Sequence, residues 1–84
     1  MKIYKISNMD NLSEDELLEK MRNEIKGYIR MRGFTYESLA RLMSEKYGSS
    51  VTPQSINNKL SRGSIKYIDV IKIALALGYK ITWT

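Results

Sequence analysis

The chain has 84 residues, of which 43% are hydrophobic and 27% charged, and its formal net charge is +5 at pH 7. It contains neither cysteine nor histidine, which excludes disulfides, zinc sites of the usual kind, thiol nucleophiles and imidazole bases. A chain this short favours a compact helical bundle or a dimer over an enzyme with a cleft. We expect one domain over residues 1–84, with an N-terminal arm or strand at 1–11, a helical core at 12–78 and a strand at 79–84.

No apolar run approaches the ~20 residues that cross a bilayer, and residues 1–6 lack the hydrophobic core of a signal peptide. We therefore expect a soluble protein of the reducing cytoplasm. The basic excess is uneven, because residues 1–26 carry five basic and six acidic side chains while residues 27–84 carry nine basic and three acidic ones. Such an excess raises the affinity for polyanions, although solvated lysines on a protein surface account for it about equally well.

The first predicted helix covers residues 12–32. Ser13 is placed to cap it, Glu16 stands at the reciprocal position of a capping box, and Gly33 can end it in a left-handed conformation. Apolar residues repeat at three- and four-residue spacing, as in a helix that faces the core. They are Leu17, Leu18, Met21, Ile25, Tyr28 and Ile29.

Charged residues occur on the same predicted helix in two groups. The carboxylates Glu14, Asp15, Glu16 and Glu19 lie where the helix dipole favours negative charge, so we interpret them as capping residues rather than acid–base catalysts. The basic residues Arg22, Lys26 and Arg30 recur every four positions. This spacing is typical of a solvated helix face, which we favour here over a phosphate-binding stripe.

Residues 34–63 predict two short helices around a turn. In the first, an apolar stripe includes Ala40, which is small enough to let the following helix cross closely. The stripe consists of Leu39, Ala40, Leu42 and Met43. The second helix should begin at Thr52, since a hydroxyl caps the free amides and Pro53 loses nothing by lacking an N–H at the first helical position.

The second of these helices has one apolar and one polar side. Ile56 and Leu60 face inward, whereas Gln54, Asn58, Ser61 and Arg62 cluster on the opposite face. Amide and guanidinium groups form paired hydrogen bonds with adenine or guanine edges in a major groove. A solvated polar side is the commoner explanation for an isolated helix, but the preceding helix favours DNA. We predict base reading by Gln54, Asn58 and Arg62, with Ser55 and Asn57 assisting.

The C-terminal part is strongly apolar. Residues 64–77 carry more apolar side chains than one side of a helix needs, so one edge either packs internally or forms a homodimer seam. Residues 79–84 alternate apolar and polar, as in a strand that places Tyr79, Ile81 and Trp83 on one face. Residues 2–6 are the other candidate strand, and the two ends would pair either within one chain or across a dimer.

The order of these features resembles the Cro and phage-repressor type of helix-turn-helix domain, the lambda repressor-like type, over residues 22–78. The matching positions are Thr35, Tyr36, Glu37, Ser38, Leu39 and Ala40 in the first helix and Thr52, Ile56, Leu60 and Gly63 in the second, with a closing helix at 69–78. Tyr36 stands where the family often has a phosphate-binding glutamine. Residues 43–47 make the first helix about one turn longer or expand the loop that follows it.

The resemblance implies an all-α helical bundle and a sequence-specific DNA-binding transcriptional regulator, repressor-like or phage-encoded, that binds double-stranded DNA as a homodimer. It places the helix at 52–62 in the major groove. It also implies phosphate contacts by Thr35, Tyr36, Thr52, Lys59 and Lys66. We expect no enzymatic activity, cofactor, metal or membrane association. The alternative is a protein-interaction module on the same scaffold, such as an antitoxin or a phage regulatory partner.

Overall fold

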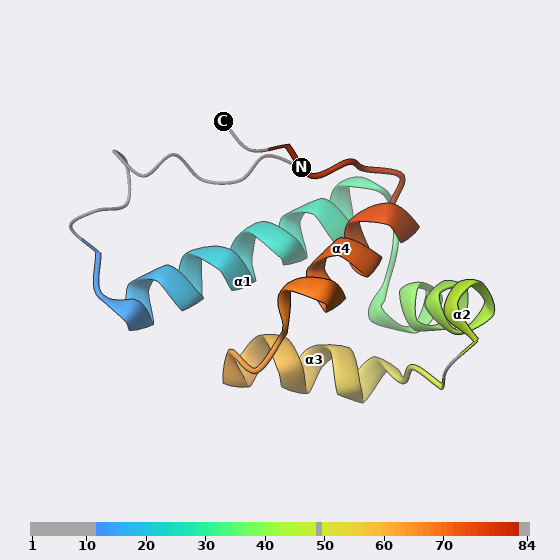
Figure 1. Cartoon of the computed structure of the whole chain (residues 1–84), viewed down its shortest axis with the longest axis horizontal. Coiled ribbons are helices and arrows are strands. Elements are labelled where there is room, and N and C mark those ends of the chain that lie inside the picture. Colours follow the sequence, from blue (N-terminus) through green and yellow to red (C-terminus); the bar gives the residue numbers. More distant parts are fainter. Residues whose placement is uncertain (1–11, 49, 83–84) are drawn as a thin grey trace.

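The computed structural model describes residues 12–48 and 50–82. This part of the chain forms four helices: α1 at Glu14–Met31, α2 at Tyr36–Tyr47, α3 at Pro53–Arg62 and α4 at Tyr67–Ala76. Figure 1 shows α1 and α3 on opposite sides of the view, α2 at one end and α4 between them. α2 packs against both α3 and α4. The described residues thus confirm an all-α helical bundle. Among these four helices, none combines the length and the hydrophobicity of a membrane span.

Hydroxyl residues cap the first three helices. The side-chain oxygens of Ser13, Thr35 and Thr52 accept hydrogen bonds from the backbone N–H three residues later, at 3.2, 3.1 and 3.1 Å. In each helix the side chain at that third position accepts a hydrogen bond from the backbone N–H of the cap. The predicted starts of α1 and α3 are confirmed, since both depend only on residues close in sequence.

The ends of α1 and α2 also follow from local signals. Gly33 takes φ 74°, and the Phe34 N–H donates to the Ile29 carbonyl at 3.0 Å, which closes α1 as expected. α2 continues to Tyr47, so the extra residues lengthen the helix. The Ser44 hydroxyl then ties the following turn to α2, because it accepts from the Val51 N–H at 2.9 Å and lies 2.8 Å from the carbonyl oxygen of Ala40.

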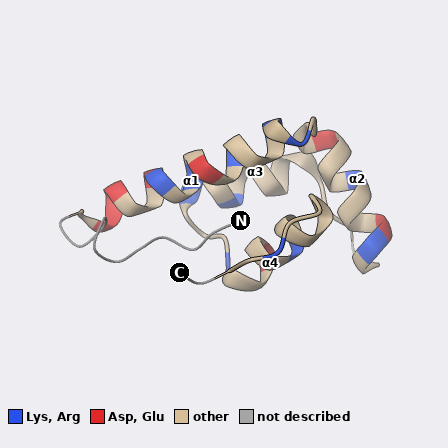
Figure 2. Ribbon diagram, turned by 90° about the horizontal axis from the view of Figure 1, so that it is seen from above, with Lys and Arg blue, Asp and Glu red and all other residues tan. Residues whose placement is uncertain are grey.

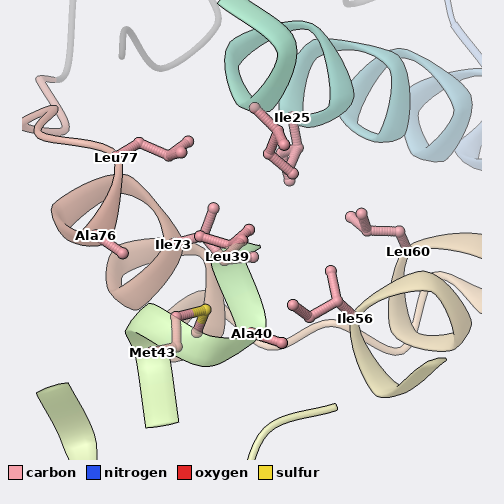
Figure 3. Packing of buried hydrophobic residues seen from close by; sticks show 10 residues of the cluster. Ile25, Leu39, Ala40, Met43, Ile56, Leu60, Ile73, Ala76 and Leu77 are labelled. Atoms are coloured by element: carbon pink, nitrogen blue, oxygen red, sulfur yellow. The ribbon is translucent and has the colours of Figure 1, made fainter. Parts of the chain in front are cut away.

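The core contains side chains from all four helices (Figure 3). Leu39 of α2 and Leu60 of α3 are fully buried, and the neighbouring Ala40 of α2 is buried as well. The core set is Ile25, Ile29, Leu39, Ala40, Met43, Ile56, Leu60, Ile73, Ala76 and Leu77. No polar side chain is buried among the described residues, so apolar packing alone holds this interior.

The predicted C-terminal strand does not form at residues 79–81. Gly78 turns the chain after α4, so that the Tyr79 N–H donates to the Ala74 carbonyl at 2.8 Å. The Tyr79 ring then packs on α1, with its centre 4.9 Å from that of Tyr28 and 4.7 Å from the guanidinium carbon of Arg32. The predicted N-terminal strand at 2–6 and Trp83 lie outside the described residues.

Candidate nucleic-acid interface

The exposed side of α3 is polar and its side chains are free. α3 buries Ile56 and Leu60 and exposes Gln54, Asn58 and Arg62 on the opposite side, together with Ser61. The side chains of Gln54, Asn58 and Arg62 make no hydrogen bond or ion pair within the part of the chain that the structure describes. Their donors and acceptors are therefore available to a ligand, as predicted for residues that read base edges.

One flank of this polar face borders a cationic depression of about 380 Å³. Asn57 of α3 lines it together with residues from α1 and from the start of α2. The full lining is Lys26, Ile29, Arg30, Phe34, Thr35, Tyr36 and Asn57. Two basic side chains thus meet the first turn of α2, where the helix dipole also favours an anion. Among the predicted site residues, Thr35, Tyr36 and Asn57 come together here.

Tyr36 lines this depression with a neutral phenol. Burial raises the pKa of Tyr36 above its ordinary value of 10.0, whereas the positive charge of Arg30 acts in the opposite direction. The phenol consequently stays protonated near neutral pH and can donate a hydrogen bond to a phosphate oxygen. This places a neutral donor beside the cation Arg30.

The other flank of α3 faces α4 and is already engaged in contacts within the chain. The Ser55 Oγ lies 2.8 Å from the carbonyl oxygen of Thr52, to which it donates, and serves the capping box. Lys59 Nζ lies 3.5 Å from Asp69 Oδ2. The same carboxylate oxygen accepts from the Lys66 N–H at 3.1 Å, at the start of α4. This flank borders a second depression, of about 260 Å³.

The predicted residues therefore divide into three groups. The first group, on the free outer face, is Gln54, Asn58 and Arg62. The second group lines the cationic depression and is Thr35, Tyr36 and Asn57. The third group is Ser55, Thr52, Lys59 and Lys66. In this group Ser55 and Thr52 cap α3, whereas the side chains of Lys59 and Lys66 are exposed on the α4 side.

The expectation that the basic residues of α1 form a solvated face is wrong for Arg22. Arg22 is partly buried, and its Nε and Nη2 donate to the carbonyl oxygens of Leu60 and Ser61 at 2.9 and 3.2 Å. Lys26 and Arg30 line the cationic depression. The four-residue spacing of these basic residues places all three on one face of α1, but only the packing of the helices brings Arg22 to the carbonyl groups at the end of α3. Arg30 is exposed, as expected for a solvated face.

These helices define a small bundle with a free polar face on α3 and a cationic depression beside it. The chain belongs to DUF6471, a domain family of unknown function, whose profile matches residues 16–82. The matched range contains every residue of the candidate interface. No match was found among curated proteins or among solved structures.

Proposed function

We propose that the protein is a sequence-specific DNA-binding regulator of the lambda repressor-like helix-turn-helix type, in which α2 supports α3 and α3 enters the major groove. The observation that carries this proposal is the free polar face of α3. Three exposed side chains with paired hydrogen-bonding groups, Gln54, Asn58 and Arg62, lie opposite the buried side of one helix. Nothing within the described residues uses these groups.

Base reading would use the amides and the guanidinium in different ways. Gln54 and Asn58 can each form two hydrogen bonds with the N6 and N7 edge of adenine, and Arg62 can do so with O6 and N7 of guanine. A helix has a diameter of about 10–12 Å with its side chains, which fits a major groove about 12 Å wide. Asn57 lies at the edge of this face and contributes from the side of the cationic depression.

Phosphate binding would occur on both flanks of α3. On the α1 side, Lys26 and Arg30 supply charge and Tyr36 supplies a neutral donor, with Thr35 at the start of α2. On the α4 side, Lys66 supplies charge at the start of α4, and Lys59 supplies charge that it shares with Asp69. A helix lying in the major groove has one sugar–phosphate strand on each side, so two basic flanks suit this placement.

The proposed regulator acts in the cytoplasm. It acts as a homodimer, because one short helix contacts too few bases for strong specificity. The exposed apolar side of α4 supports such an association. Tyr67 is 51% exposed, Ile68 53% and Leu75 48%. A two-fold seam would cover this surface and would present two copies of α3 to paired half-sites.

The decisive experiment is selection of random duplexes by the purified protein at moderate salt, followed by sequencing of the bound pool. We expect a paired, symmetric motif and a steep loss of affinity with added salt. Lys26→Ala and Arg30→Ala should each reduce the salt slope by about one, whereas Lys20→Ala, on the outer side of α1, should change it less. An unenriched pool would count against sequence-specific binding.

A protein-interaction module, such as an antitoxin or a phage regulatory partner, is the second candidate function. The exposed apolar residues of α4 favour it, because such a surface also fits the apolar side of another protein. The two functions differ in their response to substitution. Ile68→Ser would abolish partner binding in a protein-interaction module. In a dimeric DNA reader it would weaken binding to paired half-sites, while the base preference within one half-site would stay the same.

A further inference from the structure

Arg22 of α1 holds the C-terminal end of α3. Its Nε lies 2.9 Å from the carbonyl oxygen of Leu60, and its Nη2 lies 3.2 Å from that of Ser61. We propose that Arg22 is a positioning residue that sets the angle at which α3 meets DNA. This inference rests on the proposed function, but the contact itself can be tested without DNA.

The chemistry of a helix end explains why an arginine fits this position. The last carbonyl groups of a helix lack partners within the helix and carry its partial negative charge. The Ser64 N–H donates to the Lys59 carbonyl at 3.0 Å, and the Gly63 N–H donates to the Leu60 carbonyl at 3.4 Å. Arg22 adds a shorter hydrogen bond to the Leu60 carbonyl and supplies a donor to the Ser61 carbonyl. A planar guanidinium that makes two hydrogen bonds fixes the orientation of its acceptors, which the single charge of a lysine does not.

A steric contact acts at the same end of α3. Gly63 adopts φ 67°, and a Cβ built there would lie 3.0 Å from Leu18 Cδ2. Leu18 and Arg22 are four residues apart, so they lie on one face of α1. α1 therefore contacts the end of α3 through a polar pair of hydrogen bonds and through a close apolar approach.

The geometry makes this end a natural pivot for the base-reading face. Seven residues of helix separate Ser61 from Gln54, which corresponds to about 10 Å along the axis. A tilt of ~10° about the Arg22 contact would displace Gln54 by roughly 2 Å, more than the range over which a hydrogen bond retains good geometry. Loss of the contact should therefore impair base reading while phosphate attraction persists.

The functional test compares Arg22→Met and Arg22→Lys with Lys20→Met, which removes one charge from an exposed position on the same helix. We expect Arg22→Met to raise the Kd for the selected duplex about tenfold while changing the Kd for a random duplex less than about threefold. Arg22→Lys should lie between wild type and Met. Lys20→Met should leave the ratio of the two Kd values unchanged. Equal loss on both duplexes in Arg22→Met would overturn the positioning role.

A second measurement needs no DNA. In the wild-type protein, the Arg22 Nε–H should exchange slowly with solvent in NMR spectra, and Arg22→Lys should speed amide exchange in residues 60–64. Rapid Nε–H exchange would overturn the contact even if Arg22→Met failed to fold. A wild-type protein without base preference would instead overturn the proposed function, and with it the role in DNA reading, while slow Nε–H exchange would still establish the contact.

Discussion

α3 and α4 each contain ten residues and each bury one side in the same core, yet their outer sides differ in chemistry. α3 exposes amides, a hydroxyl and a guanidinium, whereas α4 exposes Tyr67, Ile68 and Leu75. Figure 2 shows that most of α4 carries no charged residue, while α1 carries many. Burial in the core therefore explains the residue types on only the inner half of each helix. The outer half indicates what each helix would contact beyond the chain.

These two outer faces suit different partners. Free hydrogen-bonding groups on α3 match the edges of bases, which present donors and acceptors. Exposed apolar groups on α4 match another apolar surface, because removing such groups from water is favourable. The proposed dimeric DNA reader uses both faces, and the substitutions below separate their contributions.

Truncation of a leucine on each helix should give the largest difference. Leu60 of α3 is fully buried and Leu75 of α4 is 48% exposed. Leu60→Ala should lower the free energy of unfolding by about 2–5 kcal/mol, because it leaves a cavity in the core, whereas Leu75→Ala should lower it by less than about 1 kcal/mol. Urea denaturation followed by circular dichroism measures both. Both variants are measured at protein concentrations below those at which the dimer forms, where equal losses would mean that Leu75 is buried within the monomer.

Removal of an amide from the polar face tests base reading directly. Asn58→Ala should cost roughly 1–3 kcal/mol on the selected duplex and almost nothing on a random duplex. Asn23→Ala, an exposed asparagine of α1, is the matched control. Fluorescence anisotropy gives the change in binding free energy for each of the two variants on each of the two duplexes. A similar cost for Asn58→Ala on the two duplexes would argue against base recognition.

Two glycines separate backbone strain from side-chain crowding. Gly48 and Gly63 take φ values of 66° and 67°, but an added Cβ meets nothing within 4 Å at Gly48 and Leu18 at Gly63. Gly48→Ala should cost about 1–2 kcal/mol from the left-handed backbone alone. Gly63→Ala should cost more, because Leu18 must also move. Thermal or urea unfolding of the two variants checks this order, which equal costs would refute.

A polar substitution on α4 should affect association more than folding. Ile68→Ser should change the free energy of unfolding of the monomer by no more than about 0.5 kcal/mol, since the side chain is half exposed. Analytical ultracentrifugation should show a dimer for the wild type and a monomer for this variant. Asn23→Ala serves again as the control, and it should sediment as a dimer like the wild type. A dimer that survives Ile68→Ser would place the seam elsewhere.

The smallest effect should come from the phenol beside the α3 flank. Burial raises the pKa of Tyr36 in the folded protein, so its contribution to stability is complete below pH 10.0 and is lost as the pH rises through the folded pKa. Tyr36→Phe should consequently lose less stability than wild type between neutral and strongly alkaline pH. Urea unfolding across this range provides the measurement. Identical pH profiles would exclude a pKa of Tyr36 that is raised by partial burial.

Much of the fold was predictable because its signals are local. Ser13, Thr35 and Thr52 hydrogen-bond with residues three positions away, and the apolar spacing of α3 places Ile56 and Leu60 inside. The free polar face of α3 follows from the same spacing. The prediction of a strand at residues 79–81 was wrong. The alternation of apolar and polar residues does not reveal that Tyr79 packs on α1 instead.

The sequence by itself determined where α1 and α3 begin, which side α3 buries and which polar residues it exposes, since these depend on residues within one or two turns. The closing helix was expected at 69–78, whereas α4 covers Tyr67–Ala76. Only the tertiary structure decided that Arg22 contacts a carbonyl group 38 positions away. It also decided that Lys26 and Arg30 line one depression with Tyr36 and Asn57. The physical reason is that such contacts depend on the angles at which the helices pack, and periodicity within a helix carries no information about those angles.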